Sequence, residues 1–290
     1  MKNIIYYLEY ILLLFLENFF YILPRKTSLS IGAAIGKILY FFGFYKKIVN
    51  KNLDFIGIFN KEEKNKIIKK LYINICKYAV DFLIINKKEI PFSIENIHIV
   101  NSLLEKNNGL IAVLAHFGNW ELLANIFGKK YNELNVIAAK MKNPYIDKWL
   151  LKKRLKTNVN LIYKENALKK MLSILKQNGI VAILIDQYAG KEGTDVPFLG
   201  KHTKTYQTVG ALMYKTNCSA VLPYAILLED DSYKVIINEF PLINISKQDK
   251  NNYIYYIQKA HNEIISEWIL KYPQHYFGWF HKRFKESILY

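Results

Sequence analysis

The pattern of hydrophobic and polar positions begins with an almost continuously apolar run. Residues 1–24 contain about 20 mostly apolar residues, the length that a helix needs to cross a bilayer. Glu9 and Glu17 interrupt the run, and on a helix they lie roughly 80° apart, so they form a narrow polar edge. Such an edge suits a helix that lies in a membrane interface or packs on a partner, and the pattern also allows a helix that spans the membrane.

A second apolar stretch follows Arg25 and Lys26 and occupies residues 28–45. Together the two stretches predict a hairpin or a pair of helices that lies in one leaflet. We therefore interpret residues 1–44 as a membrane-associating helical segment and residues 45–290 as the main domain. No window of about 18 residues in the chain is free of charged residues, which argues against a protein with several membrane spans.

The remaining pattern alternates between short apolar runs and helical periodicity. Between residues 46 and 88 the apolar positions recur at spacings of three and four among many lysines, which predicts basic helices that face either solvent or anionic lipid. Strands are predicted at 110–115, 135–140, 160–164, 179–187, 219–229 and 233–240. Helices are predicted at 120–130, 145–156, 165–177, 206–216 and 252–272. This alternation predicts an α/β fold with a mostly parallel central sheet flanked by helices.

Charge narrows the class of partner. The 290 residues include 41 Lys and Arg against 24 Asp and Glu, a formal net charge of +17. Such a surface favours an anionic partner: nucleic acid, anionic lipid or an acidic carrier protein. The 22 Tyr and 17 Phe could stack on bases. However, the aromatic residues follow apolar faces and the N-terminal apolar run would have no role, so we expect no nucleic-acid partner.

The candidate chemistry lies where predicted strands end, since ligands of such sheets bind at the carboxyl ends of the strands. His116 follows the strand at 110–115, Asn119 can cap the next helix, and Glu121 falls in its first turn. Asp186 and Gln187 end the strand at 179–187. A histidine in this position can act as a general base, and a nearby carboxylate can fix its tautomer. The alternative is a histidine that hydrogen-bonds to a backbone carbonyl.

The spacing of His116 and Glu121 is weak evidence alone, because about half a match to H-x-x-x-x-[DE] is expected by chance in this composition. His281 and Glu286 have the same spacing, but no apolar strand precedes them. The two cysteines form no C-x-x-C pair, which argues against a disulfide framework or a thiolate zinc site. The chain also lacks the G-x-S-x-G and H-E-x-x-H patterns of hydrolases and zincins.

Four sequence blocks occur in the order seen in one enzyme family. They are LAHFGNWELL, MKNPYIDKWLLKKR, DQYAGKEGTDVPFLGKHTKT and PQHYFGWFHKRFK. In this order the chain resembles, over nearly its whole length, the lauroyl or myristoyl late acyltransferases of lipid A biosynthesis. That family belongs to the wider group of lysophospholipid and glycerolipid acyltransferases with an H-x-x-x-x-[DE] motif.

The resemblance implies an enzyme at the cytoplasmic face of the inner membrane. It would take an acyl chain from acyl carrier protein and esterify a hydroxyl of a phosphorylated lipid A precursor, with no metal and no bound cofactor. His116 would be the base, oriented by Glu121 or by Asp186. Relatives with the same histidine act on lysophospholipids or other glycolipids, and coenzyme A is the alternative donor, so acceptor and donor both stay open.

The resemblance also suggests substrate-binding residues. Arg154 matches a basic position and is suited to a phosphate, although it could equally belong to a solvated basic face. Asn119 and Gln187 are placed to hydrogen-bond a polar substrate group, although capping and strand-end packing are alternative roles. Thr205 lies in a segment that resembles the loop lining the substrate cleft, in which Leu199 replaces a more usual Phe.

The carboxyl-terminal block matches the family at Trp279, His281 and Arg283. A structural role for these three residues and a contact with the substrate are both compatible with the sequence.

Overall fold

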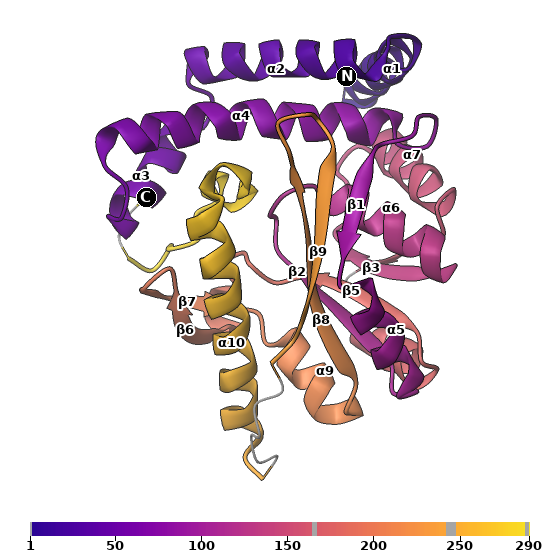
Figure 1. Ribbon diagram of the computed structural model, residues 1–290, viewed down its shortest axis with the longest axis vertical. Helices are drawn as coiled ribbons and strands as arrows, with labels where there is room; N and C mark the ends of the chain where they lie inside the picture. The colour runs from indigo at the N-terminus through magenta and orange to yellow at the C-terminus, as the bar shows by residue number, and fades with distance from the viewer. Residues whose placement is uncertain (1, 164–166, 242–247, 288–289) are drawn as a thin grey trace.

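A seven-stranded sheet lies at the centre of the computed structural model, which describes residues 2–163, 167–241, 248–287 and 290 (Figure 1). The strand order is β1-β9-β8-β2-β5-β3-β4, and every neighbouring pair is parallel except β8 with β9. The predicted, mostly parallel α/β fold is thereby confirmed. The strands are β1 (Phe92–Glu95), β2 (Leu110–Leu114), β3 (Leu134–Ala138), β4 (Val159–Tyr163), β5 (Ile180–Leu184), β8 (Ser219–Leu227) and β9 (Tyr233–Glu239).

Helices cover both faces of this sheet, as its parallel crossovers require. They are α5 (Ile97–Glu105), α6 (Trp120–Tyr131), α7 (Pro144–Leu155), α8 (Ala167–Lys176), α9 (Thr208–Thr216) and α10 (Lys250–Lys271). Short 3-10 helices are found at Gly190–Glu192, between β5 and β6 (Thr194–Phe198), and at Pro273–His275 and Phe277–Phe280, after α10. The helices predicted from periodicity occur within a few residues of their expected bounds. Glu165 and Asn166, the first two residues of one predicted helix, lie outside the described residues.

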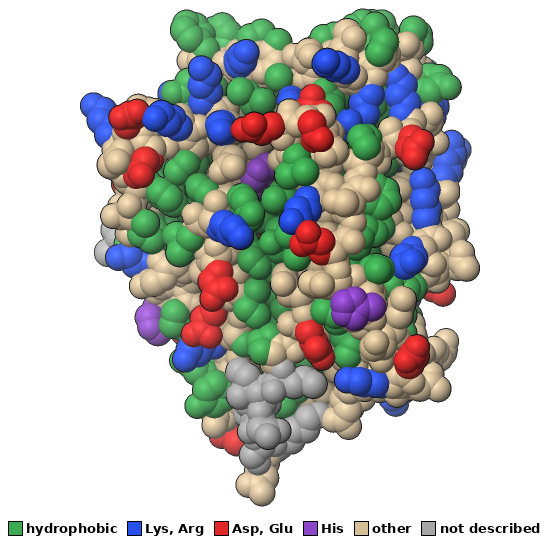
Figure 2. Space-filling model, viewed as in Figure 1, with side chains coloured by type: hydrophobic (Ala, Val, Ile, Leu, Met, Phe, Trp, Pro, Cys, Tyr) green, Lys and Arg blue, Asp and Glu red, His purple; other side chains and the backbone are tan. Residues whose placement is uncertain are grey.

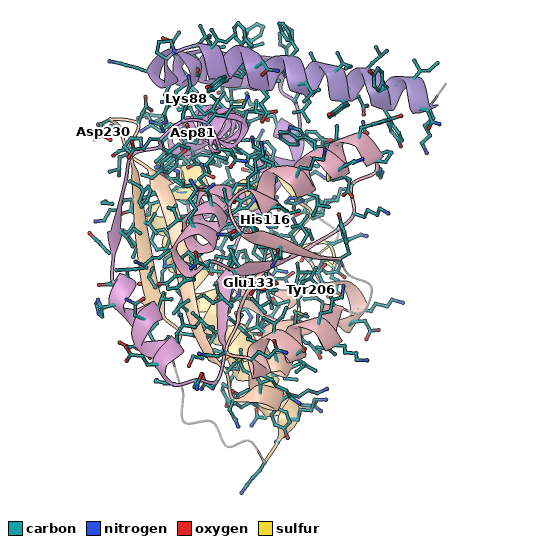
Figure 3. All side chains as sticks on the ribbon, turned by 90° about the vertical axis from the view of Figure 1, so that its right-hand side faces the viewer. Asp81, Lys88, His116, Glu133, Tyr206 and Asp230 are labelled. Carbon is teal, nitrogen blue, oxygen red and sulfur yellow. The ribbon has the colours of Figure 1, made fainter. Side chains whose placement is uncertain are left out.

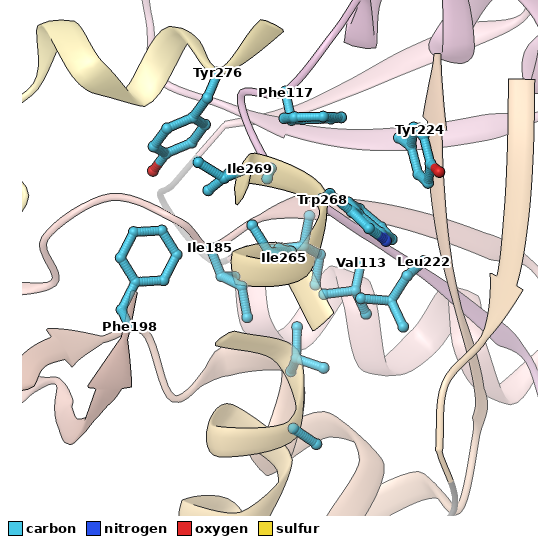
Figure 4. Close-up of a cluster of buried hydrophobic side chains, with 14 of the residues drawn as sticks. Val113, Phe117, Ile185, Phe198, Leu222, Tyr224, Ile265, Trp268, Ile269 and Tyr276 are labelled. Atoms are coloured by element: carbon cyan, nitrogen blue, oxygen red, sulfur yellow. The ribbon is translucent and has the colours of Figure 1, made fainter. Parts of the chain in front are cut away.

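The core between α10 and the sheet explains why these strands are continuously apolar. All residues of β2 are buried, because a strand in the middle of a covered sheet packs on both of its faces. Figure 4 shows Val113 and Leu222 on the sheet facing Ile265 and Trp268 of α10. The ring of Trp268 lies 4.3 Å from that of Tyr224, measured between centroids. This packing fixes the strand ends that carry the candidate site.

Two strand features were not predicted. β1 is a short edge strand in which only Ile94 is partly buried, so it lacks an apolar run. β6 (Thr194–Phe198) and β7 (Lys201–Thr205) form a separate antiparallel hairpin in which buried and solvated positions alternate. The segment that the sequence suggested as a cleft-lining loop is this hairpin.

The amino-terminal helices form a layer at one end of the molecule (Figure 1). They are α1 (Lys2–Ile22) and α2 (Arg25–Phe42), with α3 (Lys46–Ile56) and α4 (Lys61–Ile84) after them. α2 packs closely on α4, since a Cβ atom on Gly36 would lie 2.6 Å from the carbonyl oxygen of Tyr72. The predicted pair of helices is confirmed, whereas its place in one leaflet and the division of the chain at residue 44 stay predictions.

Within the described residues, α1 is the one helix whose length and composition would allow it to cross a membrane. α2 and α3 would do so only as one broken span, because they meet at 79°. Signal sequences and buried core helices can have the same length and apolar composition, so the contacts of α1 are needed to interpret it. Phe20 is its buried residue, and most of its other side chains are exposed or partly exposed.

Candidate active site

The turn between β2 and α6 carries His116 and is held by two other parts of the chain. Gly118 donates its N–H to the carbonyl of His275 at 2.8 Å, and Phe277 donates its N–H to the carbonyl of His116 at 2.8 Å. Gly118 has a φ of 61°, and a Cβ there would lie 1.9 Å from the carbonyl oxygen of Ala225. Glycine is therefore required at this position, and the carboxyl-terminal segment fixes the backbone of the histidine.

Asp186 is the hydrogen-bond partner of His116. It follows β5, which pairs directly with β2, so the two strand ends bring the side chains together. The Nδ1 of His116 lies 2.8 Å from Oδ1 of Asp186. The carboxylate can only accept, so Nδ1 carries the proton and Nε2 keeps its lone pair. The Asp186 side chain is fully buried, whereas that of His116 is 20% exposed.

The charges around this pair set its protonation. Burial lowers the pKa of His116, but the adjacent Asp186 carboxylate outweighs burial and raises the pKa above the ordinary value of 6.5. Burial raises the pKa of Asp186, but His116 and Arg283 outweigh that effect and hold it below its ordinary range. The carboxylate therefore remains ionised and stabilises the positive charge that the imidazole acquires when it takes a proton.

Glu121 has a different partner. Its Oε1 accepts a 2.6 Å hydrogen bond from Nη2 of Arg154, and both side chains are largely buried. Glu121 adds to the negative charge that raises the pKa of His116. Of the two acids that the sequence left as alternatives, Asp186 contacts the imidazole, and Glu121 orients the guanidinium of Arg154.

Gln187 joins His116 to a second histidine. Its Nε2 lies 3.1 Å from Nε2 of His281 and 3.5 Å from Nε2 of His116. The spacing to Glu286 had drawn attention to His281, but no strand precedes it, and Glu286 instead accepts a hydrogen bond from Tyr188 at 2.9 Å. The sequence had named His281 as part of the carboxyl-terminal block and left its role open; in the structure this block also holds the His116 turn.

Arg283 supports the same region from the interior. Its guanidinium donates to the carbonyl of Gln187 at 3.1 Å and to Oγ1 of Thr205 at 2.7 Å. Its exposed fraction is 1%. Arg283 therefore ties the hairpin to the end of β5, which gives this residue of the carboxyl-terminal block a clear structural role.

A cavity of about 830 Å³ opens next to these residues. Figure 3 shows His116 between the layer of α1 above and Tyr206 below. The polar part of the cavity wall includes His116, Glu121, Arg154, Gln187 and Glu192. Much of the remaining wall is apolar and comes from side chains that include Val136, Ala138, Ala167, Met171, Ile183 and Ala211. This arrangement suits a ligand that has a long apolar part and a polar end.

Two residues predicted to bind substrate lie behind the cavity wall. Asn119 is 2% exposed; its Oδ1 accepts from the N–H of Leu122 at 3.0 Å, and its Nδ2 donates to Tyr233 at 3.1 Å. Thr205 is fully buried, and its Oγ1 accepts from Arg283 and Asn262. These contacts account for both residues as structural elements of the site, and contact with the substrate stays a prediction for them.

Comparison with known families gives a match that covers nearly the whole chain. The model of a family described as bacterial lipid A biosynthesis acyltransferase matches residues 1–286. A comparison with curated proteins finds no match. The matched region contains the whole cavity and both amino-terminal helices.

Proposed function

Since the chain belongs to the bacterial lipid A biosynthesis acyltransferase family and is an acyltransferase, we propose that it moves a fatty acyl chain from acyl carrier protein to a hydroxyl of a lipid A precursor. The observation that carries this proposal is the hydrogen-bonded pair of His116 and Asp186 beside a cavity whose wall is largely apolar. A base and a site for an acyl chain are what this reaction needs.

His116 is the general base of the proposed reaction. Its Nε2 takes the proton of the acceptor hydroxyl as the oxygen attacks the thioester carbonyl, and a C–O bond forms. The tetrahedral intermediate then collapses, the C–S bond breaks, and the leaving thiolate takes the proton back from the imidazolium. Asp186 accepts from Nδ1 throughout, which fixes the tautomer and stabilises the positive charge.

Two polar groups on the cavity wall have roles in substrate binding. Arg154 is suited to a phosphate of the acceptor, because it lies on the cavity wall and Glu121 orients its guanidinium through one terminal nitrogen. The Gln187 amide, within 3.5 Å of the His116 Nε2, is suited to the thioester carbonyl oxygen on which negative charge develops.

The carrier protein and the membrane are the proposed partners. Exposed lysines adjoin wall residues of the cavity in the sequence, which favours an acidic donor; they include Lys140, Lys169 and Lys191. Exposed apolar side chains on α1 and α2 support attachment to the membrane, with residues 1–44 as the attaching segment. Since the donor is a cytoplasmic protein, the proposed location is the cytoplasmic face of the inner membrane.

Transfer of a labelled acyl chain in detergent micelles tests donor and acceptor together. Acyl carrier protein and coenzyme A thioesters are each paired with a tetra-acylated, Kdo-bearing lipid A precursor and with a lysophospholipid. The proposal predicts product from the carrier-protein donor and the lipid A precursor. Product on the lysophospholipid alone would contradict the proposed acceptor, and product from the coenzyme A thioester alone would contradict the proposed donor.

A further inference from the structure

The outward faces of α1 and α2 form one exposed apolar surface, here called the apolar layer. It includes Ile4, Leu8, Phe15 and Phe19 on α1 and Ile38 and Phe41 on α2, whose exposed fractions run from 38% to 82%. In Figure 1, α2 runs along the top edge of the molecule and α1 is seen nearly end-on, whereas in Figure 3 α1 runs lengthwise along the same edge. Both helices therefore lie flat at one end of the protein.

The inner face of α1 is attached to the catalytic domain along the length of the helix. Near its start, the Nδ2 of Asn143 donates to Glu9 at 2.9 Å and to the carbonyl of Tyr6 at 2.8 Å. Further along, Glu17 accepts from Nε1 of Trp149 at 2.9 Å and from Nζ of Lys153 at 2.7 Å. The polar edge predicted from the sequence thus packs on α7 and its N-cap residue.

The end of α1 is anchored as well. Lys88, just beyond α4, donates from its Nζ to the carbonyl of Phe20 at 3.3 Å and also to that of Leu23. Figure 3 shows Lys88 beneath this end of the helix. α1 therefore cannot leave the body of the protein at either end without breaking buried or partly buried polar contacts.

These attachments are incompatible with a membrane-spanning α1. A helix of 21 residues is about 30 Å long, the thickness of the hydrocarbon core. If α1 crossed the bilayer, α7 beside it would also lie at hydrocarbon depth. α7 carries Asp147, Lys148, Lys152, Lys153 and Arg154, and each charged side chain is strongly disfavoured there.

The charged residues around the apolar layer indicate what kind of partner covers it. Glu9 and Glu17 are the acidic residues of the segment 2–53, and both point their carboxylates toward α7 and its N-cap. Exposed lysines border the layer, among them Lys26 and Lys37. Figure 2 shows hydrophobic side chains with interspersed basic ones along this end of the molecule. An apolar face bordered by cations complements anionic headgroups above acyl chains.

We propose that α1 and α2 lie together in the plane of one leaflet of an anionic bilayer, and that neither helix crosses it. The apolar layer enters the boundary between headgroups and acyl chains, while α4 and α7 stay on the water side. This inference rests on the membrane attachment in the proposed function and adds its geometry.

Depth of spin labels tests the geometry without any catalytic assay. Single cysteines replace Ile4, Leu8, Phe15, Phe19 and Ile38 in the full chain, with Cys76 and Cys218 changed to Ala, on vesicles of phosphatidylethanolamine and phosphatidylglycerol. We expect all labels at one shallow depth, about 5–10 Å below the headgroups. A profile that is deepest at positions 8 and 15 and shallow at 4 and 19 would show a spanning helix and overturn the proposal.

Charge variants supply the matched control. Lys26→Gln and Lys37→Gln should each lower partitioning onto these vesicles on the order of fivefold, because a lysine near an anionic surface contributes about 1 kcal/mol. Lys215→Gln on α9, another exposed lysine but at the far end of the molecule, should leave partitioning unchanged. Water-exposed labels together with a dimer in solution would show that a second copy covers the layer. Absence of acyl transfer together with shallow labels would contradict the proposed function and not this membrane geometry.

Discussion

The two carboxylates beside the cavity differ in what they contact. Asp186 is fully buried and accepts from the imidazole of His116, whereas Glu121 keeps 19% of its side chain exposed and pairs with Arg154. Glu121 is five residues from the histidine in sequence and Asp186 is 70 residues away. The comparison teaches that the order of strands in the sheet, and not the spacing in the motif, decides which acid orients the base.

The largest expected difference separates these two acids. Asp186→Asn should lower kcat on the order of a thousandfold, because the amide neither fixes the tautomer of His116 nor stabilises its positive charge. Glu121→Gln should lower kcat much less, since the hydrogen bond to the imidazole remains. Steady-state kinetics on both variants measures the difference, with circular dichroism as the control for folding. A larger loss of kcat in Glu121→Gln would reverse the assignment.

A smaller effect is expected from the cation that Glu121 holds. Arg154→Gln should raise KM for the phosphorylated acceptor on the order of tenfold to a hundredfold, as expected for a lost charge-assisted hydrogen bond, with less change in kcat. Lys152→Gln removes an exposed positive charge two residues away on the same helix and serves as the control. Equal effects of the two substitutions would indicate a general charge effect and no specific phosphate contact.

The smallest effect is a shift of the pH profile. The base must be neutral to take a proton, and Asp186 raises the pKa of His116 above 6.5, so kcat/KM should fall as pH drops through a value higher than 6.5. In Asp186→Asn the burial of the imidazole, which lowers its pKa, is opposed only by the more weakly acting Glu121, so the midpoint should move to lower pH. The residual activity of the variant, measured from pH 5 to pH 9, gives this midpoint; an unmoved midpoint would show that another group titrates.

The strands of the site could be predicted because burial on two faces leaves a continuous apolar run. β2 and β5 are such runs, so His116, Asp186 and Gln187 were recognised as residues at strand ends. Their contact was not predictable, because β3 and β4 intervene in the chain and nothing in the local pattern states that β5 lies next to β2. The choice between Asp186 and Glu121 therefore stayed open until the sheet was known.

Features that depend on contacts distant in sequence were either missed or left without a partner. His281 has no strand before it, and only the fold of the carboxyl-terminal segment brings it to Gln187. β1 lacks an apolar run because it lies at the edge of the central sheet, and the β6–β7 hairpin lacks one because it forms a separate sheet with partly solvated strands. The polar edge of α1 was read from helical periodicity, yet its partner on α7 became visible only in the structure.

Single-turnover acyl transfer by the His116→Ala protein tests the central claim most directly. The labelled carrier-protein thioester and the Kdo-bearing precursor are mixed with excess enzyme, and the lipid product is followed in time for the variant and the unchanged protein. The account predicts a rate lower by about two to four orders of magnitude in a protein that folds and binds lipid normally. A rate close to that of the unchanged protein would contradict the role of His116 as the base.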